Sequence, residues 1–253
     1  MYPVSDTWSS IFGSEEHYFI PKVIVDTINE NGVVEEMEFG QDDIVEMSVS
    51  MGMFAGDVPG AGSCVSAELN LKMHQPGRTI PTMAKIQPYV MVTDGEEESE
   101  WIPQGKFFVD TRETTHDDDG MPIISFHAYD AMLKAEGDCP DVGVDWEEET
   151  ITDIEMVGRI ADELDVGIDS RTLDLMVYGY DIGVPVGMSM REVLSNIAGM
   201  YGGNWVMNYD GDLLLIGIGE IPVDTNYLVY VNGEPISFGS FSDVPEEEVI
   251  ILV

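Results

Sequence analysis

The sequence contains very few basic residues. Its 253 residues include 10 lysines and arginines against 49 aspartates and glutamates, a formal net charge of −39 at pH 7. Proteins that bind nucleic acid tightly neutralise backbone phosphates with lysine and arginine, and anionic membrane surfaces attract clusters of the same residues. Both kinds of binding are therefore disfavoured. The acidity itself leaves two interpretations open: solubility or salt adaptation, and a surface that a polyanion passes without sticking.

Cysteine is also scarce. Only Cys64 and Cys139 occur, far apart and without CxxC spacing. A disulfide framework is not expected, and buried thiols in a reducing compartment are the favoured interpretation. The histidines have no HExxH or HxH spacing and lie near no cysteine, so no metal site is predicted; they are His17, His74, His116 and His127.

Long apolar runs are missing too. No stretch approaches the ~20 residues that a membrane-spanning helix needs, and membrane insertion is not predicted. The first residues, MYPVSDTWSS, contain neither the basic nor the apolar region of a secretion signal. With 44% hydrophobic residues, the composition indicates a globular chain of one large domain or two modest ones.

No set of residues predicts catalysis or cofactor binding. His116 to Asp119 could suggest calcium, but the segment lacks the alternating ligands of a calcium loop and fits a solvated hairpin turn better. The acidic runs 96–100, 147–149 and 246–248 resemble solvated turns rather than the paired carboxylates of a glycosidase. The glycines of residues 52–62 form no phosphate-binding motif, and neither cysteine has the local signature of a nucleophile.

The aromatic residues of one segment permit two interpretations. A sugar-stacking platform is one, but their alternation along strands favours a role in the core; they are Trp101, Phe107, Phe108, Phe126 and Tyr129. Trp205, at the start of a later hairpin, is interpreted as an anchor at a domain interface.

Short strands at close spacing fill residues 1 to about 137. Alternating or β-branched runs predict strands at 17–25, 33–39, 45–51, 64–73, 84–93, 106–111 and 122–127. Asn31-Gly32 is a strong hairpin signal between the first two, and residues 128–134 favour a helix. About seven such strands predict a barrel or sandwich, residues 1–137.

The pattern becomes helical after a polar linker at 138–149. Apolar residues at helical spacing from Ile151 to Leu164 follow Thr152 and Glu155, which have capping-box spacing. A second helix is predicted after Ser189, and a hairpin from residue 204 to 218 follows it. Residues 138–218 are therefore predicted to form a small α+β domain with two helices and a hairpin.

Residues 219–253 contain strand-like runs at 227–231 and 249–253. They are too few to close a barrel. The last run, Val249 to Val253, is wholly apolar and would promote aggregation if it were exposed. We expect these strands to be covered, either as a partial second barrel or as an addition to the first.

Two segments resemble a known family. Residues 101–134, WIPQGKFFVDTRETTHDDDGMPIISFHAYDAMLK, are similar to the first barrel of phage tail-hub (baseplate hub) proteins, in which W-I-P-x-G-x-F-x-(I/V)-D, a turn and A-Y-D-A-M-L-K recur in order. Residues 189–215, SMREVLSNIAGMYGGNWVMNYDGDLLL, are similar to the capped helix and hairpin of the same family. The matching pieces reach from about residue 45 to 218.

The resemblance implies a fold and a role. The fold is mainly β with an α+β part: a tube-type β-barrel, the small two-helix and hairpin domain, and the start of a second barrel. The role is that of a structural virion protein, made in the host cytoplasm, that forms a ring at the tail tip, typically a homotrimer. Its expected neighbours are the distal tail, tail tube, tape measure and tail fibre proteins. DNA would pass through the ring without specific binding.

Two other functions stay open. The chain could be a tail-associated peptidoglycan hydrolase or the non-catalytic front part of such a lysin, or it could be a receptor- or glycan-binding module of the tail tip. The hub interpretation implies no enzyme activity and no cofactor.

Overall fold

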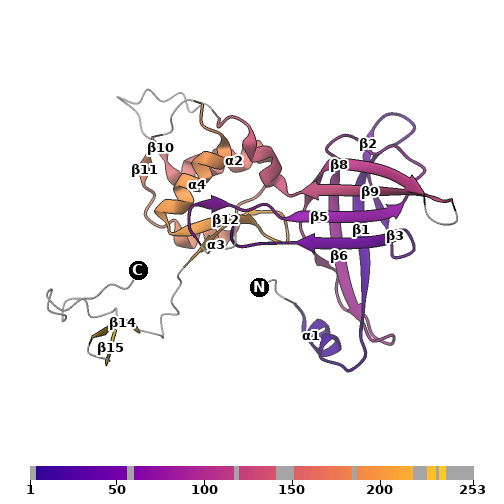
Figure 1. Cartoon of the computed structure of the whole chain (residues 1–253), viewed down its shortest axis with the longest axis horizontal. Coiled ribbons are helices and arrows are strands. Elements are labelled where there is room, and N and C mark those ends of the chain that lie inside the picture. The colour runs from indigo at the N-terminus through magenta and orange to yellow at the C-terminus, as the bar shows by residue number, and fades with distance from the viewer. Residues whose placement is uncertain are drawn as a thin grey trace. The chain divides into compact units, whose positions relative to one another are not determined.

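The computed structural model (Figure 1) describes residues 4–55, 60–116, 120–140, 151–183, 187–218, 227–231 and 234–237. The chain divides into two compact units, Met1–Ile216 and Gly217–Val253. The first unit contains nearly all the described structure. The predicted division at about residues 137 and 218 stays a prediction. No helix among the described residues is long and apolar enough to cross a bilayer.

An eight-stranded antiparallel sheet dominates the first unit, as the strand pattern predicts. The strands follow the order β2-β1-β6-β8-β9-β5-β3, with β7 paired to β6. They are β1 (Tyr18–Ile28), β2 (Val34–Phe39), β3 (Ile44–Ser50), β5 (Glu68–His74), β6 (Lys85–Thr93), β7 (Ile102–Pro103), β8 (Phe107–His116) and β9 (Pro122–Tyr129). The expected fold class, mainly β with an α+β part, is confirmed.

The sheet is open rather than a closed tube-type barrel. Its end strands are β2 and β3, which are not paired with one another. The chain turns between them at Gly40 to Asp43, where the Gly40 N–H donates to Asp43 Oδ2 (3.2 Å). The His74 N–H donates to the Asp43 carbonyl (2.8 Å). These bonds direct β3 toward β5 instead of β2, which corrects the expectation of a closed barrel.

One face of this sheet encloses an apolar core. Alternate residues of β5 are buried, as the sequence pattern predicts: Leu69, Leu71 and Met73 are at most 1% exposed. Burial of such side chains contributes roughly 1.5–3 kcal/mol each. Phe107 and Phe126 lie in the same cluster.

A second core forms around the helices. Its elements are η1 (Ala131–Glu136), β10 (Ile151–Thr152), α2 (Asp153–Leu164), α3 (Ser170–Leu175), β11 (Asp181–Ile182), α4 (Met190–Met200), β12 (Gly203–Met207) and β13 (Leu213–Gly217). Both predicted capping boxes are present, at Thr152 with Glu155 and at Ser189 with Glu192. The predicted helices and hairpin are thus confirmed, whereas α3 was not predicted. The predicted helix after β9 is a 3-10 helix.

A strand from the first part of the sequence completes the second core. β4 (Ser63–Cys64) pairs in parallel with β12. The expected single strand over residues 64–73 is therefore wrong. Its first residues leave the large sheet, because the Val65 N–H donates to the Trp205 carbonyl (2.8 Å) and the Ala67 N–H donates to Asp130 Oδ2 (2.7 Å).

A short helix, α1 (Asp6–Phe12), precedes the sheet and lies where β1 begins and β6 ends (Figure 1). No element was predicted there. In the second unit, β14 (Tyr227–Val231) and β15 (Glu234–Ser237) form an antiparallel pair. The first of them matches the predicted strand at 227–231. The other predicted strand, at 249–253, lies outside the described residues.

Candidate functional site

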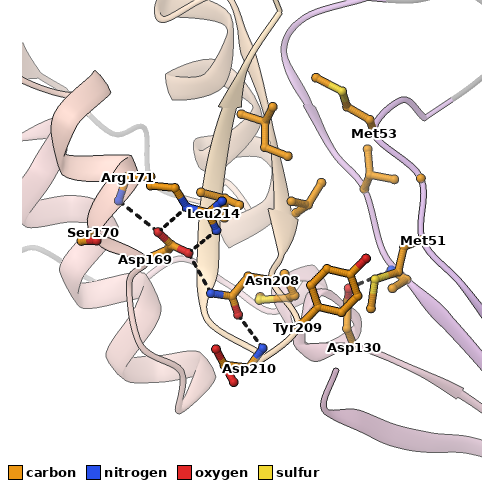
Figure 2. A pocket seen from close by; sticks show the side chains of 16 residues that line it. Met51, Met53, Asp130, Asp169, Ser170, Arg171, Asn208, Tyr209, Asp210 and Leu214 are labelled. Carbon is orange, nitrogen blue, oxygen red and sulfur yellow. Dashed lines mark hydrogen bonds and ion pairs between the residues drawn. The ribbon is translucent and has the colours of Figure 1, made fainter. Parts of the chain in front are cut away.

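A cleft of about 630 Å³ lies between the segment Met51 to Met53 and the β12–β13 hairpin (Figure 2). Its floor is apolar, with Val65, Val206 and Leu214 packed as a small cluster. Carboxylates lie at its rim. An apolar cleft with polar groups at its rim is the usual form of a binding or active site, so this cleft is the candidate functional site.

Asp169 lies at one end of the cleft, and both of its carboxylate oxygens accept hydrogen bonds from side chains of the same chain. It accepts the Arg171 guanidinium through Nε (2.9 Å) and Nη2 (2.6 Å). The Asn208 side chain adds a bond from Nδ2 (2.8 Å). These donors, Arg171 first, hold the pKa of Asp169 well below its usual range. This carboxylate is an ion-pair partner, and its lowered pKa makes it a weak base.

Asn208 organises the turn of the hairpin. Its Oδ1 accepts the backbone N–H groups of Asp210 and Asp212, both at 2.9 Å. The turn ends at Gly211, whose φ of 81° lies in the left-handed region that glycine adopts without strain. The polar residues at this end of the cleft therefore brace a turn and connect it to α3.

Asp130 closes the other side and is only 1% exposed. Its two oxygens accept the backbone N–H groups of Ala67 (2.7 Å) and Met132 (3.0 Å). Burial raises the pKa of this carboxyl to about 6, against the lowering effect of the two N–H groups and of Arg191. Asp130 joins β5 to the start of η1 and caps that helix.

The cleft has the contacts of a structural recess. Asp130 and Asp169 are held by groups of the same chain, whereas acid–base catalysis needs a carboxylate that can reach a substrate proton. The third carboxylate of the lining, Asp210, lies at the exposed turn of the hairpin. Among the residues that the structure describes, no group of three or more metal-ligating side chains is assembled. That the chain has no catalytic or cofactor-binding residue stays a prediction.

The candidate residues of the sequence analysis are scattered. His116 is exposed at the end of β8, and Asp117 to Asp119 lie outside the described residues. Cys64 is buried and accepts a bond from Ser195 Oγ (3.4 Å). Burial raises the pKa of its thiol to about 11, so it is a packing residue rather than a nucleophile. Cys139 is a free thiol as well.

The aromatic residues of the hairpin divide between two faces. Phe107 and Phe126 are buried in the core, as expected. The other three are half-buried. Tyr129 packs edge-on against His127, with 4.7 Å between ring centroids, and the other two rings meet cations. The Lys134 ammonium lies 3.6 Å from the Phe108 ring centroid, and Lys22 lies 4.5 Å from that of Trp101. Trp205 is fully buried in the second core, with Nε1 donating to the Leu194 carbonyl (2.8 Å).

Two connecting residues escaped the sequence analysis. Arg191 on α4 donates to the carbonyls of Cys64 (2.8 Å) and Met132 (2.7 Å). Asn204 is fully buried, and its Nδ2 donates to the carbonyls of Met53 (2.9 Å) and Gly60 (2.8 Å). Burying a polar side chain without a hydrogen-bond partner costs free energy. A polar residue within an apolar run, such as Asn204 before Trp205, therefore indicates a buried hydrogen bond, and this was the signal available in the sequence.

The second hollow, of about 690 Å³, covers an outer face of the large sheet. The strand register places polar side chains side by side across β3, β5, β9 and β8. One row is Glu46, Lys72, Ser125 and Glu113, and the next is Ser48, Asn70, His127 and Thr111. We call these eight residues the polar face. Its lysine, Lys72, is paired with Glu46 (2.5 Å). Arg112 lines the same hollow and donates to the Ile80 carbonyl (2.7 Å).

Most of the cations are already paired within the chain. Six of the ten lysines and arginines contact carboxylates: Lys22, Lys72, Arg78, Lys85, Arg171 and Arg191. Three of these pairs involve glutamates of β2. Glu35 pairs with Arg78, Glu36 with Lys85, and Glu38 with Lys22. The negative charge elsewhere on the molecule is therefore largely uncompensated.

The sequence matches no known family profile and no curated protein. Solved structures do match, at low identity. The crystal structure of the tail protein from Neisseria meningitidis MC58 is 12% identical with a TM-score of 0.41, over 79% of this chain and 51% of that one. The 43 kDa tail protein of prophage MuSo2 from Shewanella oneidensis is 14% identical with a TM-score of 0.37, over 77% and 52%.

A chain of the lidded Francisella PdpA–VgrG complex is 8% identical with a TM-score of 0.41, over 83% of this chain and 30% of that one. The structural neighbours are thus tail proteins, one of them from a prophage, and chains of a PdpA–VgrG complex. The present chain spans about half the length of the two tail proteins that it matches.

Proposed function

We propose that the chain is a structural subunit of a phage tail-tip hub, in which three copies form a ring that continues the tail tube and lets DNA pass. The resemblance of residues 101–134 and 189–215 to hub proteins is the starting point. These segments fold into the hairpin β8–β9 and into the capped helix α4 with the hairpin β12–β13, which are the elements that the resemblance implies.

The open sheet is the observation that carries this proposal. Its end strands, β2 and β3, have six and seven residues and no partner on their outer edges in the described part of the chain. Exposed strand edges of this length invite pairing with another chain. Two different edges on one subunit allow a head-to-tail interface, and such interfaces close into rings when the rotation permits.

The polar face supplies a surface suited to the channel. Its eight residues include Glu46 and Glu113, and Lys72, its lysine, is paired with Glu46. The guanidinium of Arg112, which also lines the hollow, is engaged by the Ile80 carbonyl. A wall with free lysines and arginines would bind DNA phosphates and release counterions. An acidic and neutral polar wall repels the polyanion over roughly one Debye length, ~8 Å at physiological salt. We assign the polar face to the lumen of the ring.

The neighbours in this proposal are the distal tail, tail tube, tape measure and tail fibre proteins, and the location is the tail tip of the virion. No step of this role requires turnover. The subunit would act through its shape and its charge.

Counting the copies tests the assembly. Native mass spectrometry or cryo-electron microscopy of mature tails should find three copies of this chain in one ring. Six copies, or an isolated copy per particle, would contradict the proposal.

Adding positive charge to the polar face tests its assignment to the lumen. The changes Ser48→Lys, Asn70→Lys and Glu113→Lys place three cations on exposed positions of the polar face. We expect slower DNA ejection from particles that assemble normally. Glu30→Lys with Glu163→Lys adds charge at exposed positions off the polar face and is the control. Equal ejection rates for the polar-face variant and the wild type would assign the acidity to solubility or salt adaptation instead.

A further inference from the structure

Four aromatic rings gather at the N-terminal end of the first unit. Trp8 stacks on Phe12 with 4.9 Å between ring centroids. Phe12 in turn lies 5.2 Å from His17 and 6.1 Å from Phe19. Although these rings contact one another, Phe12 is 47% exposed and Phe19 is 51% exposed. We call Trp8, Phe12, His17 and Phe19 the aromatic patch. Exposed clusters of large apolar side chains in soluble proteins often mark interaction sites.

Beneath the aromatic patch, the start of β1, the end of β6 and α1 pack together and form its base. Tyr18 to Ile20 at the start of β1 pair with Met91 to Thr93 at the end of β6, and α1 lies against this end of the ribbon (Figure 1). Ile11, Met91 and Val92 are buried there. The base is therefore packed, and the two exposed phenylalanines are what it presents to solvent.

A hydrogen-bonded clamp fixes α1 to the neighbouring loop. The Glu100 carboxylate accepts the backbone N–H of Ser5 (2.7 Å) and its hydroxyl (2.5 Å). Ser5 is also the N-cap of α1. The helix that carries Trp8 and Phe12 is thus oriented by residues nearly one hundred positions away in the sequence.

The surroundings of the patch are acidic. The segments that form it and its base, residues 4–19 and 91–100, contain no lysine or arginine. Their carboxylates are Asp6, Glu15, Glu16, Asp94, Glu96, Glu97, Glu98 and Glu100. Glu15 and Glu16 are exposed and lie in the turn that connects Phe12 to His17. The patch is therefore an aromatic centre with a negative rim.

We propose that the aromatic patch docks an arginine- or lysine-rich segment of another protein. Cations bind over aromatic rings through the ring quadrupole, and the acidic rim attracts the same groups. A second copy of the chain is a poor occupant, because it would bring the same carboxylates to the interface. The occupant must carry the positive charge that this chain lacks.

One atom within the patch is also unsatisfied. Trp8 Nε1 is covered and donates to no acceptor in the described residues. A buried indole N–H without an acceptor is unfavourable, because it has lost its hydrogen bonds to water. A small movement of the ring on docking would let this N–H reach a carbonyl of the bound segment.

The test uses the full chain and a defined probe, an eight-residue peptide that alternates arginine with leucine. A matched peptide carries citrulline, the neutral isostere of arginine. Titration calorimetry at physiological salt should give an affinity for the arginine peptide at least about ten-fold higher than for the citrulline peptide. Equal affinities would overturn the proposal, since charge would then play no part.

Variants locate the binding on the patch. Phe12→Ser with Phe19→Ser should weaken binding about ten-fold, and Glu15→Gln with Glu16→Gln, which leaves the packing intact, about three-fold or more. Tyr18→Ser is the aromatic control, because Tyr18 is 60% exposed but points to the opposite side of the strand from Phe19. Glu30→Gln with Glu163→Gln is the charge control, and both controls should bind like the wild type.

Other occupants predict different results. A dimer in sedimentation that Phe12→Ser with Phe19→Ser abolishes would overturn the proposal in favour of a second copy. Binding of an N-acetylglucosamine oligosaccharide that the same variant abolishes would overturn it in favour of a glycan site. Unchanged peptide binding by that variant would show that the patch is not the docking site.

Discussion

The guanidinium of Arg191, on α4, lies 2.8 Å from the backbone carbonyl of Cys64, a residue 127 positions earlier in the sequence. The same side chain donates to the carbonyl of Met132 (2.7 Å) and pairs with Glu136 (2.5 Å). One arginine therefore joins α4 to β4 and to η1. It is one of the polar links between the helical core and the segment that arrives from the large sheet.

Arg191→Met should destabilise the protein by about 2–3 kcal/mol, because two backbone carbonyls lose their donor. Urea unfolding measures the loss. Arg78→Met is the matched control, since its pair with Glu35 is on the surface and exposed pairs contribute ~0–1 kcal/mol. Equal losses in the two variants would contradict a connecting role for Arg191.

Asn204→Asp should cost at least about 3 kcal/mol, although the side chains have almost the same shape. The amide donates to the Met53 and Gly60 carbonyls, and a carboxylate would place negative oxygen against both of them in a buried position. Asn31→Asp, at the exposed turn of the β1–β2 hairpin, is a suitable comparison and should cost less. Thermal unfolding of the two variants would decide this.

Asp130 should make stability depend on pH. Its pKa in the folded chain is raised to about 6 from 3.8 by burial, so the folded state binds this proton more tightly than the unfolded state does. The stabilisation is fully present below about pH 3.8 and is lost as the pH rises through about 6.

Comparison with Asp130→Asn isolates this effect from the other carboxylates. Acidification from pH 7 to pH 4 should raise the stability of the wild type relative to the variant by roughly 2–3 kcal/mol. The variant should also be less stable at every pH, because its amide would oppose a backbone N–H donor. A gap between the two unfolding curves that stays constant with pH would rule out Asp130 as the titrating group.

Cys64 should be inert in the folded protein. Its thiol is buried and its pKa is raised to about 11, so almost no thiolate exists at pH 8. With an aromatic disulfide reagent we expect slow reaction at Cys139 and reaction at Cys64 only after unfolding in urea. The Cys64→Ala variant identifies the thiol that reacts. Rapid modification of two thiols in the native wild type would be the opposite result.

Local patterns were sufficient to predict most of the elements. The hairpin β1–β2 follows from alternation and from Asn31-Gly32, with Gly32 at φ 77°. The helices α2 and α4 follow from their apolar stripes and capping boxes. In each case the information lies within a few residues of the element that it determines.

Non-local pairing was not predictable in this way. The run from residue 64 to 73 alternates as one strand, yet β4 and β5 belong to different sheets, because Val65 and Ala67 bond to Trp205 and Asp130. The open sheet results from a corner at Asp43, which alternation does not reveal. The cleft was missed for the same reason: Asp130 and Asp169 come from segments whose proximity only the fold determines.

The parallel pairing of β4 with β12 also has a consequence for synthesis. The Ser63 N–H donates to the side chain of Asn204, 141 residues later. A nascent chain grows at about 5–20 residues per second, so this donor waits roughly 7–30 seconds for its acceptor. The large sheet can begin to form in that time, but the segment around Ser63 cannot. During this interval β4 has no strand to pair with, because its partner β12 has not yet been made.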